Sequence, residues 1–379
     1  MINFWSYKRE YKKHKNSILK LINNSLNSGQ TFFGNSLISF ENNFIKKYHS
    51  KYGAAVGSGT DAILIALYAI GIKKGDEVIT AANTAIPTVS AIISSGATPV
   101  LVDVNLNDYL INTDLIQKKI TNKTKAIIPV HLYGQSADMN KIMKIAKTNK
   151  LKVIEDCAQA QGAKYEKKYV GTFGDFGCFS FYPTKILGAY GDGGFILTKN
   201  KNMNEKIKRI RFYGIESFNK TKKYYKKYYA NEFGINSRVD EIQSAILNFK
   251  LKKVDNFIKR RIEIANLYRN KLSNLNGLVL PKVNSKNKHV YHLFTVFHKQ
   301  SKKITNILKR NKIETRVIYP YPINVMNAFK DYKYKKREYK NSINLSKNIF
   351  CLPLYPNLKN KEINIICNKL KKIIREIDN

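Results

Sequence analysis

Cysteine, acidic side chains and long apolar runs are all scarce in this sequence. Only four cysteines occur among 379 residues, and no two of them have the C-x-x-C spacing. They are Cys157, Cys178, Cys351 and Cys367. Small disulfide-stabilised proteins are much richer in cysteine. The sequence therefore excludes a disulfide scaffold, and we expect no metal site.

The most apolar stretch is too interrupted to span a membrane. Ala54–Ile72 contains Asp61, three glycines and two hydroxyl side chains, which predicts a strand, a loop and a helix. The N-terminal residues MINFWSYKREYKKHK are positively charged but lack the apolar segment of a signal peptide. We therefore expect a soluble cytoplasmic protein with no membrane partner.

The shortage of acidic residues gives a formal net charge of +40. A nucleic-acid binder is one interpretation of this excess. A general bias toward Lys, Asn, Ile and Tyr is the other, and we favour it because Lys73 and Lys74 are the only basic residues between Gly53 and Leu115. The basic clusters lie in polar stretches, at 222–227, 333–337 and 369–375. They predict a solvated surface, so no nucleic-acid partner is expected.

The order of apolar runs predicts an α/β fold. Short buried runs alternate with helical patterns from residue 53 to residue 156, which is typical of a largely parallel sheet covered on both faces. Phe176–Tyr182 and Gly193–Thr198 then look like strands joined by a Gly-rich loop, which predicts an antiparallel element in a mixed sheet. Helical spacing is strongest over 37–49, 61–69, 114–120, 139–147, 304–310 and 363–374, and in one long helix from Arg238.

The length of the chain fits two to three domains. After about residue 250 the pattern mixes short strands with amphipathic helices. We therefore place a large domain at 1–250 and a smaller α+β domain at 251–379.

The segment Gly57-Ser58-Gly59-Thr60-Asp61-Ala62 follows an expected strand and precedes an expected helix. Glycines let the backbone approach an anion, and the helix N-terminus offers unpaired N–H groups. The pattern also matches the G-x-G-x-x-A fingerprint of dinucleotide-binding folds. The acidic residue that this fingerprint expects about 20 positions later is missing, since the next strand ends in Ala81-Ala82-Asn83. Phosphate binding and a plain tight turn both stay open for this loop.

Two further strand ends carry side chains that could take part in a reaction. Asp156 ends the run Lys152–Asp156, and Lys185 follows the apolar strand that ends near Tyr182. A desolvated amine at such a place loses its proton more easily and can act as a nucleophile or base. A phosphate cradle, a buried carboxylate and a desolvated lysine are the three groups that pyridoxal phosphate (PLP) requires. The three together therefore predict a PLP site.

The chain resembles the sugar-nucleotide aminotransferases of the DegT/DnrJ/EryC1/StrS family. The resemblance covers most of the sequence. It rests on Gly57–Ala62, Pro129–Gln135 with Ala137–Met139, Glu155–Gln159, Phe179–Gly194, Gly234–Arg238 and Asp240–Gln243. The segments Ser-Phe-Tyr-Pro-Thr-Lys and Gly-Asp-Gly-Gly are the most specific. The resemblance implies an α/β, fold-type I aminotransferase fold.

The resemblance also implies a role for individual residues. Lys185 would form the Schiff base with PLP, which alternates with pyridoxamine phosphate, and Asp156 would bind the N–H of its ring. Gln159 would lie near the phenolic oxygen of the ring. Residues Gly59, Thr60 and Ser180 would hold the phosphate. Asn236 matches a residue that reaches the phosphate of the neighbouring subunit, so the resemblance implies a homodimer with shared active sites.

Three positions bear on how far the family pattern applies. Ala85 stands where most relatives have an aromatic residue that stacks on the cofactor ring. Ile318 and Asn324 replace two histidines of a family segment that contacts substrate. Some members are dehydratases with histidine in place of the lysine, so Lys185 favours transamination.

The motifs also indicate a substrate. His131–Gln135 and Gly191–Gly194 look most like members that act on dTDP-3-keto-6-deoxyhexoses, with L-glutamate as the amino donor. A 4-keto sugar nucleotide is the alternative. The product would be an amino sugar for a surface polysaccharide, such as lipopolysaccharide, or for a glycosylated metabolite. A Rossmann oxidoreductase and a basic nucleic-acid binder are the remaining classes, and neither explains Lys185.

Overall fold

The computed structural model describes residues 1–215 and 228–378. The basic cluster at 222–227 lies outside the described residues. In the cluster at 333–337 all four basic residues are exposed, as predicted. In the cluster at 369–375, Lys372 and Arg375 are exposed, whereas Lys369 and Lys371 are half-buried. Within the described ranges, no helix has both the length and the apolar character that crossing a bilayer requires.

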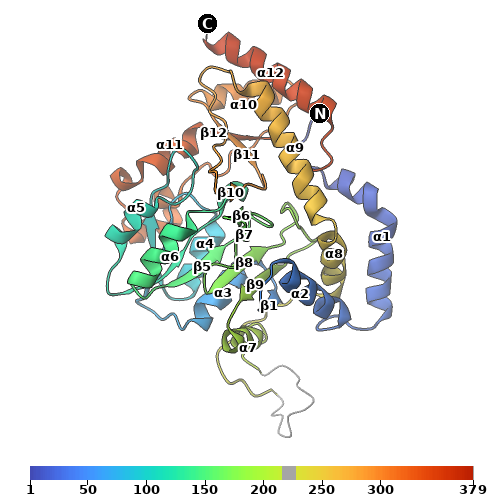
Figure 1. Cartoon of the computed structure of the whole chain (residues 1–379), viewed down its shortest axis with the longest axis vertical. Helices are drawn as coiled ribbons and strands as arrows, with labels where there is room; N and C mark the ends of the chain where they lie inside the picture. Colours follow the sequence, from blue (N-terminus) through green and yellow to red (C-terminus); the bar gives the residue numbers. More distant parts are fainter. Residues whose placement is uncertain (216–227, 379) are drawn as a thin grey trace.

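A seven-stranded sheet forms the centre of the molecule (Figure 1). Its strands are β1 (Tyr52–Val56), β2 (Glu77–Ala81), β3 (Thr98–Val102), β4 (Thr124–Ile128), β5 (Lys152–Asp156), β8 (Phe176–Ser180) and β9 (Gly194–Thr198), in the order β1-β9-β8-β5-β4-β2-β3. β9 runs antiparallel to both β1 and β8, while the other neighbours are parallel. The predicted mixed and mostly parallel sheet is confirmed.

Helices cover both faces of this sheet, because the strands are apolar on both sides. On β5, Val153 packs into one core with α6 (Met139–Thr148), while Ile154 packs into the opposite core with α3 (Gly59–Ala69). The second face also carries α4 (Ile86–Ser94) and α7 (Lys201–Ile210). α2 (Asn35–Lys47) and α8 (Glu241–Leu251) pack on the β1, β8 and β9 end of the first face. The α/β class is confirmed.

The C-terminal part has a core of its own. It packs α9 (Val254–Leu272), α10 (Ser301–Arg310) and α12 (Asn360–Asp378) around the antiparallel pair β11 (Phe294–Phe297) and β12 (Ile349–Leu352). Ile2 joins this core and pairs with Ile313. α9 contributes Ile258 to the core of the large sheet and Tyr268 to the C-terminal core. The division at residue 250 stays a prediction.

α1 (Tyr7–Asn27) is a long helix. The other remaining elements are short or peripheral. They are α5 (Thr113–Ile116), α11 (Lys340–Asn348), β6 (Lys164–Tyr165), β7 (Lys168–Tyr169) and β10 (Asn287–Lys288), with five 3-10 turns. β10, β6 and β7 form a small antiparallel sheet.

Two expectations on individual helices differ from the structure, and one helix was not expected. The helix expected over 114–120 is one α-helical turn followed by a 3-10 turn. The long helix expected from about Arg238 is α8, which begins three residues later at Glu241, and a separate helix, α9, follows after Lys252 and Lys253. The sequence did not predict α1. Only Ile18 and Ser25 of its residues are buried, so the apolar periodicity that indicates a helix is weak there.

Candidate active site

A cavity of about 480 Å³ lies beyond the carboxyl ends of β5 and β8, where ligands of α/β sheets bind. Six of the seven predicted site residues line it. They are Gly59, Thr60, Asp156, Gln159, Ser180 and Lys185. The structure therefore brings together groups that are spread over more than 120 positions of the sequence.

One end of the cavity is the N-terminus of α3. The Ser58 side chain caps this helix by accepting a hydrogen bond from the N–H of Asp61 at 3.0 Å. A Cβ on Gly59 would lie 2.6 Å from the Cβ of Ser180, so only glycine permits this approach of helix and strand. The arrangement places the Ser180 and Thr60 hydroxyls beside the helix start, which is a suitable environment for a phosphate.

Asp156 is fixed at the end of β5 by hydrogen bonds to both carboxylate oxygens. Oδ1 accepts from the N–H of Ala158 at 3.1 Å, and Oδ2 accepts from the Thr88 hydroxyl at 2.8 Å. The Thr88 hydroxyl in turn lies 3.1 Å from that of Thr84. Asp156 is only 4% exposed. A carboxylate held this way is a fixed acceptor that faces the cavity.

Lys185 lies in the irregular turn that follows β8. Its N–H donates to the carbonyl of Tyr182 at 2.8 Å. Gly188 makes the turn possible, because a Cβ there would lie 2.4 Å from the carbonyl oxygen of Pro183. Burial disfavours the charged ammonium and lowers the pKa of Lys185 from 10.5 to about 8, while the Asp156 carboxylate partly opposes this shift. The amine can thus exchange its proton near neutral pH.

Gln159 connects the cavity floor to the C-terminal part of the chain. Its Oε1 accepts from the N–H of Tyr133 and its Nε2 donates to the hydroxyl of Tyr319, both at 2.8 Å. Burial raises the pKa of the Tyr319 hydroxyl, and the nearby Asp156 carboxylate adds to the effect. Tyr319 is therefore a neutral hydroxyl at the cavity wall.

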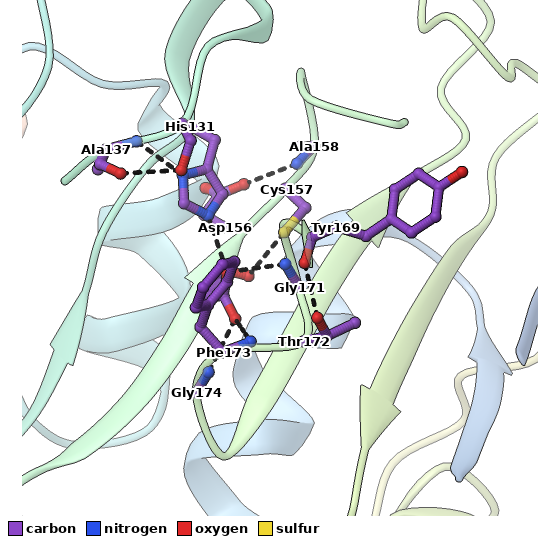
Figure 2. Close-up of polar contacts among 12 residues, drawn as sticks. His131, Ala137, Asp156, Cys157, Ala158, Tyr169, Gly171, Thr172, Phe173 and Gly174 are labelled. Atoms are coloured by element: carbon purple, nitrogen blue, oxygen red, sulfur yellow. Dashed lines mark hydrogen bonds and ion pairs between the residues drawn. The ribbon is translucent and has the colours of Figure 1, made fainter. Parts of the chain in front are cut away.

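Beneath Asp156, a buried pair of side chains secures the cavity floor (Figure 2). Glu155 is fully buried, does not line the cavity, and accepts backbone N–H groups from Gly171, Phe173 and Gly174 at 2.7–2.9 Å. His131 Nε2 lies 3.1 Å from the same carboxylate, and His131 Nδ1 accepts from the N–H of Ala137. The Nδ1 contact places the imidazole proton on Nε2, where it donates to Glu155.

Cys157 lies close enough to this pair for the three side chains to share a metal ion. The Glu155 oxygens are already used by four donors, however, and burial raises the pKa of the Cys157 thiol. The cluster instead ties the loop before β8 to the ends of β4 and β5. It therefore acts as a structural support for Asp156.

We expect His131→Leu to lower the free energy of unfolding by about 3 kcal/mol, because the Glu155 carboxylate and the Ala137 N–H both lose a buried partner. Urea denaturation of the holoenzyme measures the change. His131→Gln is the matched control, since its amide retains a donor for Glu155, and it should lose less. Equal stability of the leucine variant and the wild type would contradict the structural role.

Asn236 does not line the cavity of its own chain. It is exposed and forms an isolated bridge with Phe212. Its neighbour Ser237 accepts a hydrogen bond from the N–H of Gly57 at 2.8 Å and donates to Asp61 at 2.7 Å. Asn236 is therefore held next to the loop that carries Gly59 through its neighbour Ser237, and its own side chain is exposed.

Sequence reasoning missed Thr84, Thr88 and Tyr319 as site residues. Thr88 follows Pro87 in the first turn of α4, and that helix begins just beyond the end of β2. The position of Thr88 shortly after a strand could have identified it. The contact of Tyr319 with Gln159 spans 160 positions, and no local pattern in the sequence indicates it. Ala85 forms the N-cap of α4 and lines the cavity next to Ile86 and Pro87.

The cavity fits pyridoxal phosphate. It combines a helix N-terminus without a side chain at Gly59, a fixed carboxylate at Asp156 and an amine with a lowered pKa at Lys185. These are the groups that the phosphate, the ring nitrogen and the aldehyde of the cofactor need. Fold and site together define a PLP-dependent enzyme of the aminotransferase type.

Comparison with known proteins gives the family. Residues 12–371 match the model of the DegT/DnrJ/EryC1/StrS aminotransferase family, and the chain belongs to this family. It is 37% identical to a dTDP-3-amino-3,4,6-trideoxy-alpha-D-glucose transaminase of Micromonospora megalomicea subsp. nigra, over 98% of each chain.

Solved structures agree with this assignment. Streptomyces venezuelae DesV, crystallised in complex with a ketimine intermediate, superposes with a TM-score of 0.94 at 32% identity over 98% of each chain. Bacillus subtilis NtdA with bound pyridoxamine phosphate gives a TM-score of 0.88 at 31% identity, over 98% of this chain and 83% of that one. The protein is thus a PLP-dependent aminotransferase, and the predicted family, fold and cofactor are confirmed.

Proposed function

We propose that the protein transfers an amino group from L-glutamate to a nucleotide-linked keto sugar. The most specific form of the proposal is a dTDP-3-keto-6-deoxyhexose, which would give the dTDP-3-amino sugar. The observation that carries it is the full-length similarity to a transaminase whose name specifies a 3-amino sugar linked to dTDP. The His131–Gln135 and Gly191–Gly194 segments support the same position of amination.

Each predicted site residue has a role in this proposal. Gly59, Thr60 and Ser180 hold the cofactor phosphate, and Asp156 accepts the N–H of the cofactor ring. Gln159 lies beside the ring, near its phenolic oxygen. The bound cofactor supplies an electron sink for the carbon that gives up its proton. Lys185 binds the cofactor, is displaced by the donor and then carries one proton at its Nζ.

The charge of the cavity supports a homodimer with shared sites. Among the described residues that line it, Lys185 is the only basic one, whereas Asp156 and Asp192 are acidic. A cofactor phosphate and a dicarboxylate donor both need additional cationic or N–H partners. A second copy can supply them, and the exposed Asn236 lies on the surface that would reach across.

The surface beside Asn236 is rich in exposed aromatic side chains. Phe233 is 73% exposed and Phe32 is 41% exposed, with the guanidinium of Arg238 4.4 Å above the Phe32 ring. Exposed aromatic side chains of this kind are enriched at protein interfaces. This patch and the cavity charge are the support for the homodimer.

The dimer proposal is tested by mixing two inactive variants. Lys185→Ala and Asn236→Asp each damage one half of a shared site, so hybrids formed after partial denaturation and refolding should regain part of the wild-type activity. Each variant refolded alone is the control. Mixtures that stay inactive although hybrids form would contradict sites shared between subunits.

The substrate proposal is tested by incubating the PLP-loaded enzyme with glutamate and a panel of keto sugars linked to dTDP, UDP or GDP. We expect the highest kcat/KM with a dTDP-3-keto-6-deoxyhexose, and an NMR spectrum of the product with nitrogen on C3. Nitrogen on C4 would establish the alternative, a 4-keto sugar-nucleotide aminotransferase. Absence of turnover with every keto sugar would refute the substrate class itself.

The lowered pKa of Lys185 predicts how the apoenzyme takes up its cofactor. Only the neutral amine attacks the aldehyde, and the neutral form increases with pH up to the pKa. The rate of uptake, measured by stopped-flow absorbance, should therefore rise up to about pH 8 and then level off. A rate that continues to rise toward pH 10.5 would indicate an unperturbed lysine.

A further inference from the structure

A second cavity, of about 330 Å³, lies between α1, α9 and the residues near Pro356. Ile186, the residue after Lys185, forms part of its wall, so the cavity borders the turn that carries Lys185. None of the residues assigned above to cofactor or substrate binding lines it. Its wall therefore has no role in the proposed function.

The wall of this cavity is strongly basic. It is lined by Lys13, His14, Lys253, Arg260 and Arg261, against one acidic residue, Glu10. Glu10 forms an ion pair with Lys250, so its single negative charge is shared between that lysine and the cations of the wall. Burial lowers the pKa of His14, and the nearby charges of Lys253 and Lys13 lower it further, although Glu10 partly opposes them. Arg260 is paired with Glu263 and Asn360. The other cations of the wall outnumber Glu10, so the cavity carries an excess of positive charge.

Arg261 is the central group of the wall, and it is fully buried. Its Nη1 donates to the carbonyls of Tyr291, His292 and Leu354 at 3.0–3.1 Å. Its Nε and Nη2 have no hydrogen-bond partner within the described part of the chain. Burial lowers the pKa of Arg261 to about 9. Burying a guanidinium whose N–H groups have no acceptor costs folding free energy, unless an anion binds to those N–H groups.

A second buried donor belongs to the same wall. The Trp5 ring lies 5.2 Å from Cζ of Arg261, and its indole Nε1 also has no hydrogen-bond partner among the described residues. Arginine presents its Nε and Nη2 as a fork that matches two oxygens of a phosphate or carboxylate. The unpaired N–H donors and the positive charge therefore both favour an anionic ligand with acceptor oxygens.

We propose that this cavity binds a small anion with two or more acidic oxygens, a phosphate monoester or a dicarboxylate, on Arg261. The site is separate from the transamination site. An anion bound here would neutralise the cluster around His14 and contact the turn beside Lys185.

The test uses the PLP-loaded enzyme at low salt, so that the cofactor already fills its own phosphate site. Inorganic phosphate and succinate are the two probes, and calorimetry measures their binding. We expect one saturable site per chain for at least one of them. Phosphate alone would identify a phosphate-binding site, and succinate alone a dicarboxylate site. Absence of saturable binding for both would overturn the proposal.

Variants distinguish this site from binding in the active site. Lys253→Gln and Lys13→Gln remove one charge each from the wall and should weaken binding by about threefold. Lys15→Gln is the matched control, because Lys15 is exposed on the same α1 helix and does not line the cavity. Equal affinity of all three variants would place the anion elsewhere and overturn the proposal.

The ring protons of His14 give a readout that does not depend on these variants. An anion on Arg261 offsets the positive charges of Lys13 and Lys253, so the pKa of His14 should rise when the probe is added. NMR titration with and without the probe measures the shift, and His14→Gln assigns the signal. An unchanged pKa at saturating probe would contradict binding in this cavity.

Discussion

Replacing Lys185 with alanine is expected to lower kcat by about 10³-fold or more, because the proposed mechanism uses Lys185 both as the nucleophile and as the proton carrier. Borohydride reduction of the PLP-loaded enzyme, followed by denaturation, should leave the cofactor attached to the wild type and free of the variant. The remaining contacts at Gly59, Ser180 and Asp156 do not involve Lys185, so the variant should still bind PLP reversibly.

Lys201→Ala is the control for this experiment. Lys201 is an exposed residue at the start of α7 that does not line the cavity, and its loss should leave kcat and borohydride labelling unchanged. Covalent labelling that persists in Lys185→Ala would move the Schiff-base role to another amine. Full activity of the variant would refute the proposed role of Lys185 altogether.

Asp156→Asn is expected to lower kcat by about 10²-fold or more, since removal of a preorganised charge at the reacting group has effects of this size. The amide oxygen of asparagine can still accept from the N–H of Ala158, and its nitrogen can donate to the Thr88 hydroxyl. The variant should therefore fold normally and lose only the negative charge that the proposal places opposite the ring nitrogen. Steady-state kinetics and thermal unfolding measured together separate the two effects.

A graded pair of variants at Thr88 checks the same contact. Thr88→Val removes one hydrogen bond to the Asp156 carboxylate and should lower the affinity for PLP by about tenfold, whereas Thr88→Ser keeps the hydroxyl and should behave like the wild type. Wild-type kinetics for both Asp156→Asn and Thr88→Val would show that Asp156 does not face the reacting ring.

The strand-end residues of the site were predictable because their positions follow from local pattern. An apolar run of five residues predicts a buried strand, and parallel strands place their carboxyl ends at one edge of the sheet. Asp156 ends β5 and Lys185 follows β8, which is a neighbour of β5. The sequence therefore implied that both residues lie at the same edge of the sheet, and the structure added that β5 and β8 are neighbours.

Contacts between distant segments were not predictable in this way. Tyr319, in the C-terminal part of the chain, accepts a hydrogen bond from Gln159. Glu155 accepts hydrogen bonds from backbone N–H groups of a loop 16 to 19 positions later. In the sequence, Glu155 and Asp156 are two adjacent carboxylates. Only the alternation of side chains along β5 turns one toward the cavity and the other into the protein interior.

The sequence by itself determined the α/β class, the mixed sheet, the family and the positions of Gly59, Asp156 and Lys185, because periodicity and motif spacing are properties of local segments. The tertiary structure alone decided that Thr88 holds Asp156, that Asn236 lies outside its own cavity and that Arg261 is buried with unpartnered N–H groups. Apolar periodicity specifies which side chains are buried, whereas the partner that each buried polar group finds depends on how distant elements pack.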